Sequence, residues 1–348
     1  MKKLILIALA AVLAACGQSP KGSGREKLAG AGATFPLPYY NLAFKTYRDS
    51  VPAEVSYGGI GSGGGIRSLK DRIVDFAGSD AYLTDAEMAA MPDSVIHIPT
   101  CMGAVVMAYN LPGVEKLKLT GELVADIYLG KITRWNDARI RGINPSVQLP
   151  DLEIHPVYRS DGSGTTFVFS DYLTKVSPAW KETIGAGKSL EWPAGLAAKG
   201  NPGISGTVSQ TEGAVGYIGS EYAFAQHISY ASLQNKAGRF IDPTLESISA
   251  AAAGDLPTDT RCMITDPDAA DAYPISCFTW ILLYKEQGYD KRTREQSEAL
   301  VDLLGWMLGS QAQDLAGKVN YAPLPQQVID NGRAQLGTVT YKGEKLLK

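Results

Sequence analysis

From Lys27 onward, short β-branched or apolar runs alternate with amphipathic segments along the chain. This alternation is typical of an α/β protein in which helices flank largely parallel sheets. Apolar residues at helical spacing predict three of the helices: Tyr40, Phe44 and Tyr47 after Pro36, which can begin a helix; Leu123, Ile127 and Tyr128 before Gly130; and Phe169, Tyr172, Leu173 and Val176 after residues 162–164.

Two strongly apolar segments, residues 103–109 and 277–284, are predicted to be strands. Without its first 26 residues the chain still has about 320 residues, more than one core usually organises, so two domains are expected. If both strands cross between two lobes, residues 25–102 and 279–348 form lobe I and residues 103–278 form lobe II. The ligand is then expected between the lobes, because open α/β sheets bind ligands beyond the carboxyl ends of their strands.

Two lysines and an apolar run over residues 4–12 give the N-terminus the layout of a secretory signal, predicted to be residues 1–15. The run is too short to span a bilayer comfortably, and no later segment is apolar enough to cross one. Cys16 directly follows Leu-Ala-Ala, which resembles the bacterial lipobox, so we expect a lipidated Cys16 and a flexible tether over residues 16–26. An ordinary signal peptide with a chance cysteine is the alternative. The expected location is the cell envelope, with the protein periplasmic and lipid-anchored to a membrane.

The composition is that of a globular protein, with 45% hydrophobic and 20% charged residues. The formal net charge of −3 gives no electrostatic case for binding nucleic acid, so any anion site must be built locally. The three histidines, His97, His155 and His227, are widely separated and have no neighbouring cysteine or acidic cluster at ligand spacing. We therefore expect no metal site, and the sequence indicates no cofactor.

Three cysteines follow Cys16, namely Cys101, Cys262 and Cys277, and in an oxidising compartment they can pair. Cys262 and Cys277 lie almost symmetrically about the turn-rich residues 265–268, so a hairpin would bring them face to face. The sequence leaves open whether these two form a disulfide or stay free. Cys101 is expected to be a small buried apolar residue.

Four segments have the composition of a helix start that can bind an anion. At a helix start the first N–H groups lack partners and the helix dipole is positive, while glycine lets the backbone approach closely. In residues 30–36, Thr34 is placed at the N-cap, although an ordinary capped helix would look much the same. In residues 58–66, Ser62 lies in a glycine run before a helical-looking segment, and a plain linker is the alternative.

The other two segments add charge. In residues 75–81, Asp80 puts a carboxylate at the end of a short apolar strand, where the alternative is a helix cap for residues 85–88. In residues 159–166, Arg159 offers a guanidinium that can make paired hydrogen bonds to a tetrahedral oxyanion, beside a glycine-rich helix start. A surface turn with a chance arginine is the alternative for this last segment.

Five motifs carry a further signal: GAGATFP at position 30, YGGIGSGGG at 57, DFAGSDA at 75, DIYLGKITRW at 126 and YRSDGSGTTFVFSDYL at 158. In order and spacing, over essentially the whole mature chain, they resemble the periplasmic phosphate-binding proteins of bacterial ABC transporters. The resemblance implies a two-lobed periplasmic-binding-protein fold, with mixed, mostly parallel sheets flanked by helices and two crossover strands acting as hinges. It also implies high-affinity binding of inorganic phosphate and its delivery to the membrane permease and ATPase components of a transporter.

The resemblance assigns phosphate contacts residue by residue: Thr34, Phe35 through its N–H, Ser62, Asp80, Arg159, Ser163, Gly164 through its N–H, and Thr165. It gives Asp161 a supporting role, which is to hold Arg159 in place. One departure is Gly63, where many relatives carry a second serine. Asp80 is expected to accept the proton that phosphate still carries near neutral pH, whereas sulfate has no proton and would meet the carboxylate as a like charge.

Three other functions stay open from the residues alone. A receptor for another tetrahedral oxyanion, such as sulfate or molybdate, is disfavoured by Asp80. A phosphate-ester hydrolase would need a metal or a nucleophile with its base, whereas the site residues include no adjacent histidine or lysine, so we expect a binding protein and not an enzyme. An adhesive or structural lipoprotein that kept the fold is the third alternative.

Overall fold

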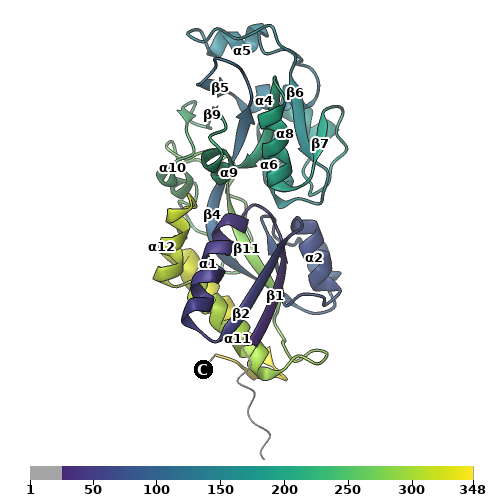
Figure 1. Cartoon of the computed structure of the whole chain (residues 1–348), viewed down its shortest axis with the longest axis vertical. Coiled ribbons are helices and arrows are strands. Elements are labelled where there is room, and N and C mark those ends of the chain that lie inside the picture. The colour runs from purple at the N-terminus through teal and green to yellow at the C-terminus, as the bar shows by residue number, and fades with distance from the viewer. Residues whose placement is uncertain (1–25, 348) are drawn as a thin grey trace, which may run out of the picture.

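The computed structural model describes residues 26–347 (Figure 1). The strands are β1 (Glu26–Gly32), β2 (Ala53–Gly59), β3 (Phe76–Ser79), β4 (Val95–Tyr109), β5 (Leu117–Leu119), β6 (His155–Arg159), β7 (Leu196–Ala198), β8 (Ala214–Gly219), β9 (Ala231–Gln234), β10 (Phe240–Ile241), β11 (Ser276–Tyr284), β12 (Thr340–Tyr341) and β13 (Glu344–Lys345). The helices are α1 (Leu37–Ser50), α2 (Ser62–Lys70), α3 (Asp85–Ala89), α4 (Gly121–Tyr128), α5 (Ala138–Ile143), α6 (Gly164–Val176), α7 (Pro178–Thr183), α8 (Gly200–Gln210), α9 (Ser220–Ala225), α10 (Leu245–Ala250), α11 (Arg294–Met307), α12 (Ser310–Lys318) and α13 (Gln326–Leu336).

The expected signal peptide, Cys16 and the tether as far as residue 25 lie outside the described residues. Within residues 26–347, no helix is both long enough and apolar enough to cross a membrane.

Eight strands form the main sheet, in the order β2-β1-β3-β11-β4-β8-β6-β7. At one end of the sheet β1 pairs in parallel with β2 and β3, and at the other end β6 pairs in parallel with β7 and β8. The central strands β11 and β4 run antiparallel to each other and to their outer neighbours β3 and β8. The sheet is therefore mixed, and the expected parallel pairing is found in its two outer parts.

Strand β4 connects the two halves of the sheet (Figure 1). Its residues as far as Ala104 pair with β11, and from Val105 onward they pair with β8. Helices α1, α2 and α11 pack around the half that contains β1, which we call the first half, and α6 and α8 pack around the half that contains β6, the second half (Figure 1). This arrangement confirms the expected two-lobed α/β fold.

Strand β4 begins earlier than the predicted start at residue 103. All 15 of its residues are buried, so the strand has no exposed face, as is usual for a central strand covered on both sides. His97 interrupts the apolar pattern, but its Nε2 accepts a hydrogen bond from the N–H of Leu83 at 3.0 Å. Burial lowers the pKa of His97 to about 3, so the side chain is neutral and can be tolerated in the core.

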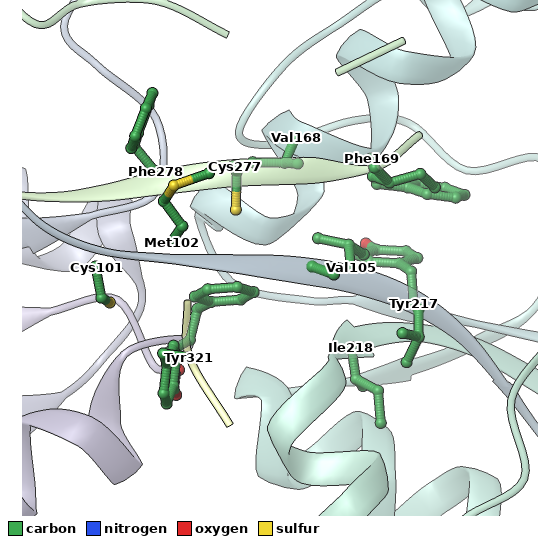
Figure 2. Close-up of a cluster of buried hydrophobic side chains, with 14 of the residues drawn as sticks. Cys101, Met102, Val105, Val168, Phe169, Tyr217, Ile218, Cys277, Phe278 and Tyr321 are labelled. Carbon is green, nitrogen blue, oxygen red and sulfur yellow. Dashed lines mark hydrogen bonds between the residues drawn. The ribbon is translucent and has the colours of Figure 1, made fainter. Parts of the chain in front are cut away.

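The hydrophobic core continues along β4 from one half to the other (Figure 2). Tyr321, which follows α12 in the first half, lies on the other side of β4 from the Met102 side chain, and paired backbone hydrogen bonds between Met102 and Ala322 join its segment to β4. On the other side of the crossing, Phe169 and Tyr217 stack with ring centroids 4.3 Å apart. The core therefore does not end at the boundary between the halves.

The cysteines of the described chain are free thiols, so of the two alternatives left open by the sequence the structure shows unpaired Cys262 and Cys277. Cys277 lies in the buried strand β11, which pairs with β3 and β4, whereas Cys262 lies in a half-buried loop. No strand occurs between residues 242 and 275, so the turn at residues 265–268 joins no hairpin. Cys101 is fully buried, as expected.

The three helices predicted from apolar spacing are α1, α4 and α6, and all three are confirmed. In α1 the aromatic residues Tyr40, Phe44 and Tyr47 are buried together, which explains why their spacing predicted the helix. Pro36 is the N-cap of α1, and Gly130, with a φ of 71°, follows α4. A positive φ suits glycine at the end of a helix.

Candidate functional site

Helix starts from both halves lie at the carboxyl ends of parallel strands. In the first half α1 follows β1, α2 follows β2, and Asp80 follows β3; in the second half α6 follows β6, α8 follows β7 and α9 follows β8. Parallel strands end at the same edge of a sheet, so each half presents its helix starts together. A hydrogen bond of 3.0 Å from the Gly164 N–H to Ser62 Oγ joins the two groups. The sequence-predicted segments therefore meet at the interface of the halves.

Thr34 is buried, but it is not the N-cap of α1, because the helix begins after Pro36 and has no side-chain cap. Its hydroxyl oxygen instead accepts hydrogen bonds from the backbone N–H and the side-chain amide of Asn201, at 3.0 and 3.1 Å. The interpretation of this segment as an ordinary capped helix is therefore wrong. Phe35 is fully buried, and among residues 26–347 its backbone N–H donates to no protein acceptor.

Ser62 is the first residue of α2, so the glycine run is a helix start and not a linker. The Ser62 hydroxyl oxygen accepts hydrogen bonds from the backbone N–H groups of Gly164, at 3.0 Å, and of Asp80, at 3.4 Å. The backbone of Gly63 lies against that of Gly162, with its N–H donating to the Gly162 carbonyl at 2.9 Å. A β-carbon at Gly63 would come within 3.1 Å of the Gly162 Cα, so the serine that many relatives carry at position 63 would be crowded here.

Asp80 is 1% exposed and lies between the two halves. One carboxylate oxygen accepts the hydroxyl of Thr279 on β11 at 3.0 Å, and the other accepts the hydroxyl of Thr165 on α6 at 3.2 Å. Burial raises its pKa to about 7, because these hydroxyl groups and Arg159 offset only part of the desolvation. The alternative role as a helix cap is wrong, since Thr84 caps α3.

Arg159 and Asp161 form an ion pair at the end of β6. The Arg159 Nε donates to Asp161 Oδ1 at 2.7 Å and Nη2 donates to Oδ2 at 2.5 Å, in a bidentate geometry. Burial opposes ionisation of Asp161, but the hydrogen bonds and charge of Arg159 outweigh it and hold its pKa below the ordinary value. Arg159 is 5% exposed, which excludes a surface turn, and its pairing with Asp161 is the contact expected from the sequence.

Ser163, Gly164 and Thr165 form the start of α6 and are buried. Ser163 is the N-cap, and its hydroxyl oxygen accepts the N–H of Thr166 at 3.0 Å. The Gly164 N–H is directed across the interface to Ser62, and the Thr165 hydroxyl is directed to Asp80. A β-carbon at Gly164 would come within 2.5 Å of Ser62 Oγ, so this position needs glycine for the halves to touch.

Two residues at the site were missed from the sequence, Asn201 and Thr279. Asn201 is fully buried and contacts the hydroxyl groups of both Thr34 and Thr165, and Thr279 contacts Asp80. The signal for Asn201 was present, because a glycine and a polar residue start a helix just after the short strand β7. Thr279 lies inside an apolar strand and carried no comparable signal.

Arg159 is the buried cation of this site, and neutral N–H and O–H groups from several helix starts surround it. Asp80 is the carboxylate that faces both halves, and it is surrounded by donors. A tetrahedral oxyanion is stabilised by such donors, and a protonated one can also donate to Asp80. Residues 26–347 contain no group of three or more histidine, cysteine, aspartate or glutamate side chains that could hold a metal ion.

Comparison with known proteins agrees with this geometry. A sequence model described as the PBP superfamily domain matches residues 17–311. The phosphate-binding protein PstS of Xylella fastidiosa strain Temecula1 is 40% identical over 308 residues, which cover 87% of this chain and 83% of that protein. The chain belongs to the PstS family of phosphate-binding proteins. This confirms the resemblance seen in the sequence motifs.

A second PstS relative, from Pasteurella multocida, is 39% identical over 318 residues that cover 90% of each chain. Both relatives are named phosphate-binding proteins. Among solved structures, the periplasmic phosphate-binding protein PfluDING, bound with phosphate, matches 88% of this chain and 93% of its own with a TM-score of 0.72 at 22% identity. A phosphate-binding protein from Stenotrophomonas maltophilia covers the same shares with a TM-score of 0.68 at 21% identity. These structural matches show that the chain shares the fold of these two proteins.

Proposed function

We propose that this protein binds a single inorganic phosphate ion between its two halves and delivers it unchanged to a membrane ABC transporter. The observation that carries the proposal is Asp80, a buried carboxylate surrounded by donors where helix starts of both halves meet. Membership of the PstS family supports it, because those relatives are named phosphate-binding proteins.

The proposed ligands come from both halves: Thr34, the Phe35 N–H, Ser62 and Asp80 from the first, and Arg159, Ser163, the Gly164 N–H and Thr165 from the second. Asp161 is the proposed support of Arg159. In the described structure the Gly164 N–H and the Thr165 hydroxyl have protein partners in the opposite half. Phosphate would exchange these contacts for its own oxygens, so both halves close around the same small network.

Asp80 is the proposed source of selectivity. Phosphate near neutral pH carries a proton that it can donate to the carboxylate, whereas sulfate cannot donate and brings only negative charge. A buried like-charge contact costs several kcal/mol, which is enough to reject sulfate by orders of magnitude. The same reasoning disfavours molybdate as the cargo.

We further propose that residues 25–102 and 279–348 move as one lobe and residues 103–278 as the other. The change of partner along β4, from β11 to β8 after Ala104, supports a hinge at this strand. Phosphate would select the closed arrangement, because only then do both sets of ligands reach it. The permease and ATPase components of the transporter are the proposed partners of the closed form.

Catalysis is not part of the proposed function. Hydrolysis of a phosphate ester needs a base that activates the attacking group. The two carboxylates assigned to the site are committed otherwise, since Asp161 is ion-paired with Arg159 and Asp80 accepts the hydroxyl groups of Thr165 and Thr279. We expect no turnover of a phosphomonoester by the pure protein.

The proposed location is the periplasmic side of a membrane, held by lipid on Cys16. The Leu-Ala-Ala-Cys motif supports the anchor, and the Gly/Ser/Pro-rich segment after it would give the folded part freedom to reach the transporter. Replacing Cys16 by serine should release the protein from membranes in a fractionation of cells. A Cys16→Ser protein that stays membrane-bound would contradict the anchor.

Equilibrium dialysis of the pure protein with labelled phosphate tests the function directly. We expect one phosphate per chain, displaced by unlabelled phosphate and not by excess sulfate. An absence of stoichiometric binding would defeat the proposal. Displacement by sulfate at equal concentration would instead favour a general oxyanion receptor.

A further inference from the structure

The side chain of Asn201, the second residue of α8, joins the two halves of the site. Its amide nitrogen donates to the Thr34 hydroxyl oxygen at 3.1 Å and to the Thr165 hydroxyl oxygen at 3.2 Å. Thr34 belongs to the first half and Thr165 to the second. Asn201 itself is fully buried, so water does not compete for these bonds.

The orientation of the Asn201 amide is fixed by Gly219 at the end of β8. The Gly219 N–H donates to Asn201 Oδ1 at 3.0 Å. Because an N–H group cannot face the NH₂ end of an amide, the oxygen must point to Gly219 and the NH₂ group must point to the two threonines. The side chain therefore acts as a donor toward both hydroxyl groups.

This donor role restricts what each hydroxyl can do. A hydroxyl oxygen has two acceptor positions and one hydrogen to donate. Thr34 Oγ1 accepts from both the backbone N–H and the amide of Asn201, so both acceptor positions are filled. Its remaining capacity is to donate.

Thr165 is restricted in the same way. Its oxygen accepts from Asn201 at 3.2 Å and from Arg159 Nη1 at 3.5 Å, and its hydrogen is donated to Asp80. With both hydroxyl groups unable to accept, Asp80 remains as the acceptor for a proton carried by a ligand.

The backbone of α8 holds Asn201 in this position. Gly200 has a φ of 71°, a conformation that favours glycine, and its N–H donates to Asp161 Oδ1 at 3.0 Å. The next N–H, of Asn201, donates to Thr34. The start of α8 therefore links the carboxylate that supports Arg159 to the hydroxyl groups on which Asn201 acts.

We propose that Asn201 is a positioning residue that keeps the Thr34 and Thr165 hydroxyl groups as donors and so leaves Asp80 as the acceptor for the phosphate proton. This rests on the proposed function. It predicts that the site favours phosphate with one proton over phosphate with two, because the second proton would face a donor. Asn201 thus selects the protonation state of the cargo.

Phosphate binding by Asn201→Ala, measured by calorimetry at pH 8 and at pH 6, tests this selection. At pH 8 we expect affinity to fall about thirtyfold, the effect of losing hydrogen bonds in a buried site. At pH 6, where phosphate carries two protons, the loss should be about fivefold smaller, because Thr34 can now accept one of them. Each loss is taken relative to the unaltered protein at the same pH, because the two proteins share the titration of Asp80 and of the buried Glu221, whose pKa values burial raises.

Asn201→Asp is a second test of the proposal, and Asn144→Asp is its matched control. Asn144 is also buried, but its amide bonds only to the backbone of Lys118 and Ile140, away from the site. We expect Asn144→Asp to lower thermal stability and to leave phosphate affinity within about twofold of the unaltered protein. Asn201→Asp keeps the shape but accepts from the threonines, so we expect at least a thousandfold loss of affinity, about 4 kcal/mol.

Asn201→Asp keeps the proposal testable if Asn201→Ala is poorly folded, and a double-mutant cycle tests the coupling between Asn201 and Thr34. If Asn201 acts through Thr34, the phosphate affinity lost by Asn201→Ala should be mostly absent when Thr34 is already valine. Additive losses, an equal loss at pH 6 and pH 8, or Asn201→Asp with unaltered affinity would each overturn the inference. Failure of the unaltered protein to bind phosphate would overturn the proposed function instead, so the two failures can be told apart.

Discussion

Asp80 and Asp161 are carboxylates of the same site, one from each half, and their surroundings differ. Asp80 meets the neutral hydroxyl groups of Thr165 and Thr279, and burial raises its pKa to about 7. Asp161 also loses water, but it meets the guanidinium of Arg159, and its pKa stays below the ordinary value. The difference teaches that burial alone does not assign a role: one carboxylate is prepared to share a proton and the other to orient a cation.

The largest expected effect comes from removing Arg159, the ion-pair partner of Asp161. Arg159→Ala leaves a carboxylate in the site without its cation and removes the guanidinium from the ligand. We expect phosphate affinity to fall about a thousandfold, or about 4 kcal/mol, in calorimetry. Arg159→Lys is the control that keeps the charge without the bidentate geometry, and it should recover only part of the loss. Affinity within tenfold of the unaltered protein in Arg159→Ala would remove the role of this side chain.

Asp161→Asn should weaken phosphate binding less than Arg159→Ala does. The amide cannot accept both N–H groups of Arg159, so the guanidinium loses its fixed orientation but stays in the site. We expect about a thirtyfold weaker phosphate affinity, or about 2 kcal/mol. Asp151→Asn is a matched control, because Asp151 pairs with Arg134 at an exposed position and should change affinity by less than twofold. Equal effects of the two variants would show that Asp161 is an ordinary ion-pair partner.

The raised pKa of Asp80 predicts that the stability of the phosphate-free protein depends on pH. A carboxyl whose pKa is raised on folding stabilises the protein fully below its unfolded pKa, and this contribution is lost as pH rises through the folded pKa. For Asp80 the loss should extend from about pH 4 to about pH 7, with a slope approaching 1.4 kcal/mol per pH unit, and then level off.

Asp80→Asn isolates this contribution in urea unfolding at a series of pH values. His97, whose pKa is lowered to about 3, and Glu221, whose pKa burial raises, also change stability in this range, but they are common to both proteins. The unaltered protein should lose stability relative to Asp80→Asn between pH 4 and pH 7. Parallel curves across this range would mean that Asp80 ionises as readily in the fold as out of it.

The smallest expected effect concerns an ion pair that spans the halves and touches neither carboxylate. Lys188 Nζ in the second half lies 2.7 Å from Glu87 Oε1 in the first, near the surface. Lys188→Ala should weaken closure and phosphate affinity by about threefold, with the ratio of phosphate to sulfate affinity unchanged. Lys131→Ala, which breaks a pair within the second half, should leave affinity unaltered. A changed ratio of phosphate to sulfate affinity in Lys188→Ala would mean that Lys188 contributes to selectivity as well.

Much of the fold was predictable because the buried faces repeat at regular spacing. The apolar residues of α1, α4 and α6 sit at helical intervals, and β11 is apolar except for Ser276 and Thr279. The early part of β4 was not predicted, because His97 interrupts the run and is satisfied only by the distant backbone of Leu83. Similarly, turn residues near 265–268 signal a turn but not which strands it joins, so the sequence left the disulfide between Cys262 and Cys277 open, and in the structure both cysteines are free.

The candidate site was predictable where one segment holds both a helix start and the groups proposed to bind the ligand, as at Arg159 and Gly164. Thr34 was placed near the site but given the wrong local role, because a hydroxyl before a helix predicts a cap unless a partner from elsewhere takes it. That partner, Asn201, is 167 residues away. Its amide is fixed by Gly219 at the end of yet another strand, and no local pattern specifies such a contact.

The most direct test of the central claim is calorimetry of phosphate and sulfate with the unaltered protein and with Asp80→Asn. The unaltered protein should bind phosphate and give no measurable heat of sulfate binding. In Asp80→Asn the gap between the two anions should narrow, because the side chain no longer repels an anion without a proton. Selectivity that is the same in both proteins would contradict the account of Asp80.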